Sequence, residues 1–169
     1  MQVPARLLTA SSRPSGPLEH LQRETVVSAP LAATFAFFAE AANLAWLTPP
    51  SLGFTVITLM PVTMRVGLEI DYGISVYGMR MPWRSRIDVW EPGACFVDRQ
   101  TIGPYRWWRH EHRFETVAGG TRVIDHVEYL PRLRWLTAAI VRRDVARIFD
   151  YRQLTLLRHF VSPSGERRR

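Results

Sequence analysis

The sequence contains no lysine, only one cysteine and no long run of hydrophobic residues. The single cysteine, Cys95, cannot form an internal disulfide and has no second thiol with which to hold a metal cluster. No segment reaches the roughly 18 consecutive apolar residues that a membrane-spanning helix requires. A secretory signal is not predicted, because Arg6 interrupts residues 1–12 and the run Leu7-Leu8 is too short for its hydrophobic core. These absences predict a soluble, cytoplasmic protein without stable membrane insertion.

Arginine supplies all 22 of the Lys/Arg cations, against 15 acidic residues, and the formal net charge is +7. A basic balance is typical of proteins that bind nucleic acid or anionic membranes. Much of the excess, however, lies after residue 131, in one predicted helix and a terminal tail. The use of one type of cation also indicates a coding bias rather than selection for phosphate contacts, although arginine serves such contacts well. We therefore favour a solvated helix face with a basic tail and expect no nucleic-acid partner.

Residues 18–160 are expected to form one domain, because the 169-residue chain is 47% hydrophobic and can bury a core. Residues 1–17 include Pro4, Pro14, Gly16 and Pro17 and predict a flexible arm. Residues 161–169 are predicted to be a disordered basic tail.

Alternating hydrophobicity predicts a series of strands, whose ends are marked by glycine and proline. Residues 106–116 and 121–130 form the clearest hairpin, because they flank Ala118-Gly119-Gly120. Two short helices are expected after the first strand, over residues 31–40 and 41–47, since Pro49 ends the second one. Further strands are predicted over residues 18–28, 54–59, 68–77, 83–90 and 94–101.

Residues 137–160 contain neither glycine nor proline and predict one long helix. At about 100° per residue, its apolar face contains Ala138, Val141, Val145, Ile148, Phe149, Leu156 and Phe160. Only the sheet is large enough to cover this stripe. The sequence therefore predicts an α+β fold, in which a strongly bent antiparallel sheet of about six or seven strands wraps around the C-terminal helix.

Several segments resemble the START-like, polyketide-cyclase superfamily, and in particular its small bacterial ligand-binding branch. They are residues 26–30 (VVSAP), 104–114 (PYRWWRHEHRF), 119–121 (GGT), 125–131 (DHVEYLP) and 148–152 (IFDYR). The resemblance covers roughly residues 18–160 and departs at Gln153-Leu154, where another basic pair is expected. It implies a helix-grip fold with a cavity for a hydrophobic ligand. It does not imply catalysis, since the superfamily includes binders, carriers, cyclases and hydrolases.

The 106–130 hairpin is predicted to direct an unusual set of polar residues toward the helix. Pairing residue 116 with residue 121 places His112 opposite Asp125 and His110 opposite Val127. Strand alternation then puts one set of side chains on the concave face: Trp108, His110, His112, Phe114, Val123, Asp125, Val127 and Tyr129. The opposite face carries mainly charged residues and is expected to face water.

The imidazoles beside Asp125 support three hypotheses. A carboxylate raises the basicity of a neighbouring imidazole, so His110, His112 and Asp125 could act in acid–base catalysis. They could instead orient a ligand, or satisfy one another as buried polar groups. No serine or cysteine can be placed beside them, so a nucleophilic triad is not supported. The same three residues could also bind a metal, but their spacing is common, and we predict neither a metal nor a cofactor.

Arg152 is predicted near the centre of the apolar stripe of the long helix. Its guanidinium could bind a carboxylate or phosphate of a ligand. The alternatives are that it extends to solvent or pairs with a sheet carboxylate such as Asp125, and we slightly favour these.

The sequence predicts a carrier or sensor that binds a small hydrophobic or aromatic molecule between sheet and helix. The alternative is a cyclase, aromatase or dehydratase that uses the histidines and Asp125. A third class, RNA or acidic-membrane binding, requires the arginines to converge on one patch. A monomer or homodimer is expected. The predicted ligand-binding residues are Tyr72, Trp108, His110, His112, Phe114, Asp125, Val127, Tyr129, Val145, Phe149 and Arg152.

Overall fold

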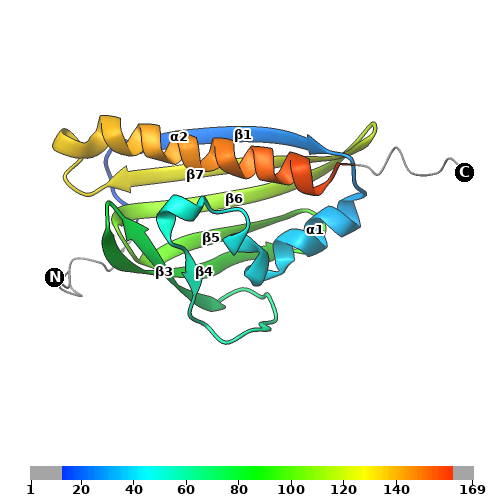
Figure 1. The fold of residues 1–169 in the computed structure, drawn as a ribbon, viewed down its shortest axis with the longest axis horizontal. Coiled ribbons are helices and arrows are strands. Elements are labelled where there is room, and N and C mark those ends of the chain that lie inside the picture. Colours follow the sequence, from blue (N-terminus) through cyan, green and yellow to red (C-terminus); the bar gives the residue numbers. More distant parts are fainter. Residues whose placement is uncertain (1–12, 162–169) are drawn as a thin grey trace, which may run out of the picture.

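Seven antiparallel strands form one sheet in the order β1-β7-β6-β5-β4-β3-β2 in the computed structural model, which describes residues 13–161 (Figure 1). The sheet is not closed into a barrel. The strands are β1 (Glu19–Val27), β2 (Thr55–Val56), β3 (Glu69–Val76), β4 (Met79–Glu91), β5 (Cys95–Ile102), β6 (Tyr105–Val117) and β7 (Gly120–Pro131). This confirms the predicted α+β helix-grip architecture.

The helices lie on the concave face of the sheet. α1 (Leu31–Ala39) and the short 3-10 helices η2 (Ala41–Ala45) and η3 (Pro50–Leu52) separate β1 from β2. The long helix α2 (Arg134–His159) lies along β1 and β7 (Figure 1). Within residues 13–161, no helix is both long and apolar enough to cross a membrane.

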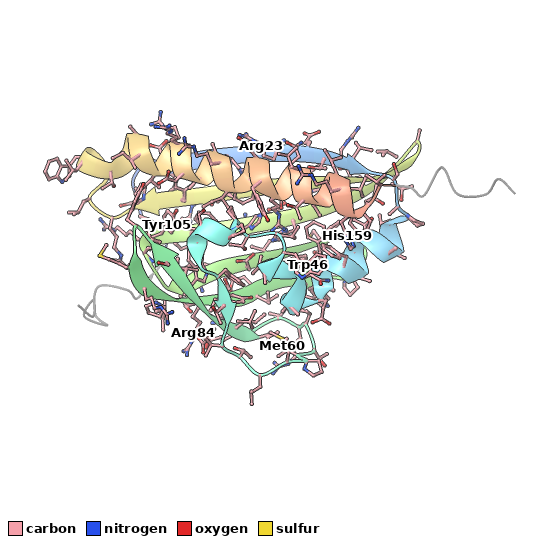
Figure 2. The ribbon with its side chains drawn as sticks, viewed as in Figure 1. Arg23, Trp46, Met60, Arg84, Tyr105 and His159 are labelled. Carbon is pink, nitrogen blue, oxygen red and sulfur yellow. The ribbon has the colours of Figure 1, made fainter. Side chains whose placement is uncertain are left out.

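The apolar stripe of α2 packs as its spacing predicts. Val145 and Phe149 are buried against Leu21 and Val127, while Leu156 is buried with Phe114 and other residues toward the opposite end of the sheet. α1 closes that end through Phe35 and Phe38, and Figure 2 shows Trp46 beside His159, whose ring centroids are 6.2 Å apart. Tyr105 lies near the other end of the sheet (Figure 2).

The β6–β7 hairpin has the predicted register. Thr116 pairs with Thr121, which places His112 opposite Asp125. All eight residues assigned to the concave face are buried. Here the alternation of the sequence is sufficient, because a two-residue turn between long strands leaves little freedom in pairing.

The predicted strand over residues 54–59 is wrong in its length, because only Thr55–Val56 pair with β3. Beyond Val56, the N–H groups of Ile57 and Thr58 both donate to the carbonyl of Asp71, at 2.8 and 3.3 Å. The Thr58 hydroxyl in turn accepts from the Asp71 N–H at 2.8 Å. A side chain thus replaces the next ladder partner and ends this edge strand. The second predicted helix is also shorter, a 3-10 helix over Ala41–Ala45.

The predicted arm over residues 1–17 and the predicted tail over residues 161–169 lie mostly outside the described residues.

Candidate functional site

A cavity of about 790 Å³ lies between the sheet, the segment from α1 to η3, and α2. β3, β4, β5 and β6 supply its floor, and α2 supplies one wall. Its volume falls within the range of roughly 300–1,000 Å³ that is common for small-molecule sites.

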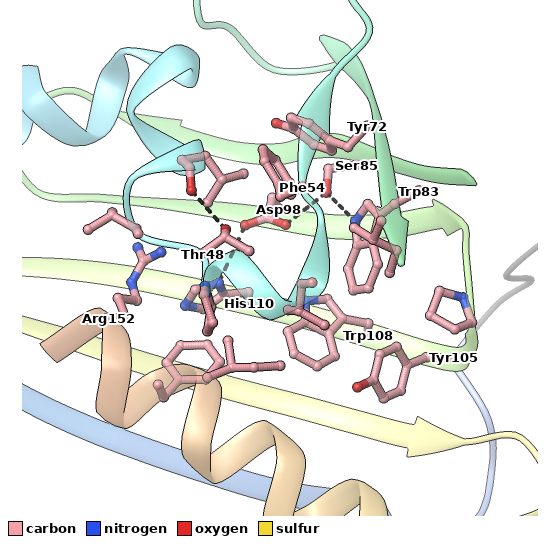
Figure 3. Close-up of a pocket in the computed structure, with 18 of the residues that line it drawn as sticks. Thr48, Phe54, Tyr72, Trp83, Ser85, Asp98, Tyr105, Trp108, His110 and Arg152 are labelled. Atoms are coloured by element: carbon pink, nitrogen blue, oxygen red, sulfur yellow. Dashed lines mark hydrogen bonds and ion pairs between the residues drawn. The ribbon is translucent and has the colours of Figure 1, made fainter. Parts of the chain in front are cut away.

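Aromatic side chains form one end of the cavity (Figure 3). The ring of Trp83 meets Trp108 and Tyr105 edge-on, with centroids 5.4 and 5.8 Å apart. Phe54 packs on Tyr72 at 5.0 Å. Aromatic faces offer a large apolar contact area with little rotamer freedom to lose. This end therefore suits a flat apolar group.

Five charged or titratable side chains lie at the base of the cavity and are called the polar cluster: Asp98, His110, His112, Asp125 and Arg152. Asp98 is partly buried, and the other four are buried. His110 Nε2 is 2.9 Å from Asp125 Oδ1, and His112 Nδ1 is 3.0 Å from the same oxygen. His112 Nε2 is 3.3 Å from Asp98 Oδ2. Arg152 Nε is 3.2 Å from Asp125 Oδ2.

Strand pairing explains why these residues meet. His110 and His112 are two positions apart on β6 and therefore point to the same face. Asp125 lies opposite His112 on β7, and Asp98 lies opposite His110 on β5. Three adjacent strands thus bring their polar residues to one level of the sheet, and α2 places Arg152 over them (Figure 3).

A chain of hydrogen bonds extends the polar cluster along β4. The Trp83 indole N–H donates to Ser85 Oγ at 3.0 Å, and the Ser85 hydroxyl donates to Asp98 Oδ1 at 3.1 Å. Ser85 does not form a nucleophilic triad, because the Asp98 carboxylate lies between its hydroxyl and the imidazoles.

Both carboxylates of the polar cluster are ionised. Burial opposes the charge of Asp125, but Arg152 and the two imidazoles outweigh it and hold its pKa well below the usual value. Burial likewise opposes the charge of Asp98, yet His112, His110 and Ser85 lower its pKa. Burial is the larger cause and the charge of His112 the smaller cause of a lowered pKa of His110, which is about 4. This imidazole is therefore neutral at pH 7.

The predicted site residues fall into two groups. Tyr72, Trp108, His110, His112, Phe149 and Arg152 border the cavity. The other five are buried outside its wall: Phe114, Asp125, Val127, Tyr129 and Val145. Asp125 is covered by the imidazoles and Arg152, and the four apolar residues belong to the solid packing under α1 and α2. For these five, a ligand contact is not supported.

Arg152 pairs with a sheet carboxylate, which is one of the alternatives that the sequence left open. It is 4% exposed and does not extend to solvent. Its guanidinium carbon lies 5.1 Å from the ring centroid of Phe38 and 6.0 Å from that of Phe149. These contacts and Asp125 fix the side chain at the edge of the cavity.

Sequence analysis missed Asp98 and Ser85 as members of the site. The alternation Phe96, Asp98, Gln100 within the predicted strand over 94–101 was a usable signal, since it puts Asp98 on the same face as a buried aromatic residue.

Comparisons with known proteins identify a fold. Residues 84–160 match the model of a family described as a domain of unknown function (DUF8410). No curated protein matches the sequence.

Solved structures resemble the chain at low sequence identity. Protein CV1439 from Chromobacterium violaceum is 16% identical, with a TM-score of 0.68 over 84% of this chain and 97% of that one. The Zhui aromatase/cyclase from Streptomyces sp. R1128 is 18% identical, with a TM-score of 0.64 over 88% and 99%. Ara h 8.0201 is 14% identical, with a TM-score of 0.59 over 84% and 99%. These likenesses confirm the START/polyketide cyclase-like helix-grip fold.

Proposed function

We propose that this helix-grip protein binds a small, largely apolar molecule in the cavity between the sheet and α2. The observation that carries the proposal is the combination of an aromatic-lined cavity of about 790 Å³ with the polar cluster at its base. Such a distribution is typical of ligand sites, in which apolar walls supply affinity and a few polar groups fix orientation.

The wall and the polar cluster together support one class of ligand. Trp83, Trp108 and Phe54 suit an aromatic or polycyclic body. His110 and Asp98 face the cavity with acceptor atoms, which favours a ligand that carries a hydroxyl donor at one end. The aromatase/cyclase among the similar structures is consistent with a ligand of this shape.

Titration with Nile red, an uncharged dye whose fluorescence rises in apolar surroundings, tests the proposal. We expect one dye per chain. Ile74→Trp should weaken binding at least tenfold, because Ile74 is on the cavity wall and the larger side chain occupies the dye volume. Ile140→Trp is the matched control, since Ile140 lies exposed on α2. Absence of dye binding, or equal binding by the two variants, would contradict the proposal.

A cyclase, aromatase or dehydratase activity is the second candidate, because His110 and His112 both border the cavity. The low pKa of His110 makes it a weak base at pH 7, so the proton transfer would fall to His112. Mass spectrometry of a polyketide-like compound incubated with the protein separates the two functions. An enzyme converts the compound and loses this activity in His112→Asn, whereas a binder releases it unchanged.

Several arginines on the sheet are paired with carboxylates in the described part of the chain. Arg84, Arg99, Arg109, Arg113 and Arg122 each pair with a carboxylate on the sheet. This pairing favours a solvated surface over a phosphate-binding one on the sheet. The cytoplasmic location and the monomeric or homodimeric state remain predictions.

A further inference from the structure

We propose that Asp98, His110 and His112 bind one divalent transition-metal ion at the base of the cavity. This inference goes beyond the proposed ligand binding and does not depend on it. It also differs from the metal site considered from sequence, in which Asp125 was the third ligand.

The three candidate ligand atoms converge. One ligand atom from each residue lies within 4.8 Å of those of the other two. Asp98 Oδ2 is 3.3 Å from His112 Nε2 and 3.8 Å from His110 Nδ1. Ligand atoms around a tetrahedral ion with bonds of about 2.0–2.1 Å lie about 3.3 Å apart. The residues therefore need only small adjustments to share an ion.

Asp125 has the position of the outer carboxylate that orients metal-bound histidines. His110 Nε2 is 2.9 Å from Asp125 Oδ1, and because Arg152 Nε donates to the other oxygen of that carboxylate, Asp125 is placed as an acceptor and Nε2 carries the hydrogen. The lone pair of His110 Nδ1 is thereby left on the side of Asp98 Oδ2. Two acceptors that face one another repel unless a cation lies between them. A carboxylate behind a metal-bound imidazole is the usual means of fixing its tautomer.

His112 can also bind the metal while it donates to Asp125, but only in one of its two tautomers. With the hydrogen on Nδ1, it points toward Asp125 Oδ1 at 3.0 Å and leaves Nε2 free to bind metal. With the hydrogen on Nε2, it donates to Asp98 at 3.3 Å, and Nδ1 accepts from Arg152 Nη2 at 3.2 Å. The first tautomer makes a metal site, and the second makes a purely structural network.

The charges of the polar cluster also favour a cation. With both imidazoles neutral, the form that binds a metal, Asp98 and Asp125 carry two negative charges and Arg152 supplies one positive charge. One negative charge stays uncompensated in a buried site, which is costly. A divalent ion removes this deficit.

The identity of the ligands restricts the ion. Two imidazoles and one carboxylate suit Zn²⁺, Fe²⁺, Co²⁺ or Ni²⁺ better than Ca²⁺ or Mg²⁺, which prefer oxygen. Asp98, His110 and His112 all border the cavity, whereas Asp125 does not. Three protein ligands with the remaining position open to a cavity are typical of a metal that also contacts a small molecule.

Titration of the chelator-treated, full-length protein with Co²⁺ tests the site. We expect one equivalent to bind, with visible d–d absorption and without the thiolate charge-transfer band that Cys95 would give. Zn²⁺ should displace it. Asp98→Asn and His110→Asn should each weaken binding at least about 100-fold, because loss of an outer partner alone costs 10–100-fold.

His126→Gln is the matched control. His20 Nδ1 and His126 Nε2 are 3.4 Å apart on the solvent-facing side of the sheet and form a second close imidazole pair. Co²⁺ affinity should be unchanged in this variant. Loss of binding in His126→Gln with retention in Asp98→Asn would overturn the proposal, as would the absence of stoichiometric binding to the wild-type protein below about 100 µM metal.

A measurement on the wild-type protein covers the case in which the buried variants do not fold. Proton NMR of the Co²⁺ form should show two hyperfine-shifted imidazole N–H signals, from His110 Nε2 and His112 Nδ1. Both should exchange slowly with solvent, since both point at the buried Asp125. Signals that exchange rapidly, or none, would overturn the proposal. Nile red binding by the metal-free protein tests the cavity separately, so the two proposals can fail independently.

Discussion

The concave face of the sheet has two halves that differ in what covers them. β1 and β7 lie directly under α2, and their inward residues, such as Val123 and Val127, are completely buried in solid packing. β3, β4 and β5 face the cavity instead, and the segment from α1 to η3 forms its other wall. The polar cluster lies on the border, with Asp125 on the packed half and Asp98 on the open half.

The comparison shows that an inward-facing residue can have either of two tasks. On the packed half it stabilises the fold, and on the open half it can contact a ligand. Strand alternation distinguishes inside from outside, but it does not distinguish these two tasks. Measurements of stability separate the two tasks.

The largest effect on stability is expected for Arg152→Met, which removes the ion pair between Arg152 of α2 and Asp125 of the packed half. It leaves Asp125 buried without its cation, so the free energy of unfolding should fall by about 3–5 kcal/mol. Urea denaturation measures the change. Adding Asp125→Asn should restore at least half of the loss, because the unpaired charge disappears. A loss below about 1 kcal/mol for Arg152→Met would show that the pair does not stabilise the fold.

Two truncations to alanine compare the halves directly. Leu156→Ala should cost about 3 kcal/mol, because this side chain is completely buried against Phe114 and its neighbours. Ile74→Ala should cost about 1–2 kcal/mol, because one side of Ile74 faces the cavity and loses fewer contacts. Thermal and urea unfolding of both variants provide the test. Equal losses would mean that the cavity wall is as tightly packed as the core.

The pH dependence of the free energy of unfolding tests the environment of His110, which belongs to the polar cluster between the two halves. The pKa of His110 is about 4 in the folded protein and about 6.5 when unfolded. The unfolded state therefore binds the proton first, and stability falls as pH falls below 6.5 and levels off near 4. For metal-free protein we expect a loss on the order of 2 kcal/mol between pH 7 and pH 5.

His110→Asn should remove most of this pH dependence, whereas His126→Gln, on the outer face, should not. A wild-type stability that stays constant between pH 7 and pH 5 would show that folding does not lower the pKa of His110.

The sequence was sufficient for the parts of the structure that local rules determine. The hairpin register follows from a tight turn, and it places His112 opposite Asp125. The stripe of α2 follows from its helical period, and it places Arg152 toward the sheet. These two patterns predicted four of the five members of the polar cluster.

The cross-strand partner of Asp98 could not be predicted, because the link between β5 and β6 breaks the ladder. The Gln100 side chain donates to the Tyr105 carbonyl at 2.9 Å and accepts from its N–H at 3.2 Å. Since a side chain replaces the expected backbone partner, the number of residues in the turn does not determine the pairing of Asp98 with His110. The cavity was also beyond local rules, because its boundaries depend on how far α2 stands from each strand.

The ion pair of Arg152 has a consequence for the two walls of the cavity. A shift of α2 along its axis by one turn, about 5.4 Å, would carry the guanidinium of Arg152 out of reach of Asp125. Both buried charges would then lack a partner. α2 is therefore a stationary wall. The opposite wall consists of two 3-10 helices and a two-residue strand, which few ladder bonds restrain. We therefore expect the side of the cavity formed by residues 41–56 to be the more adaptable one.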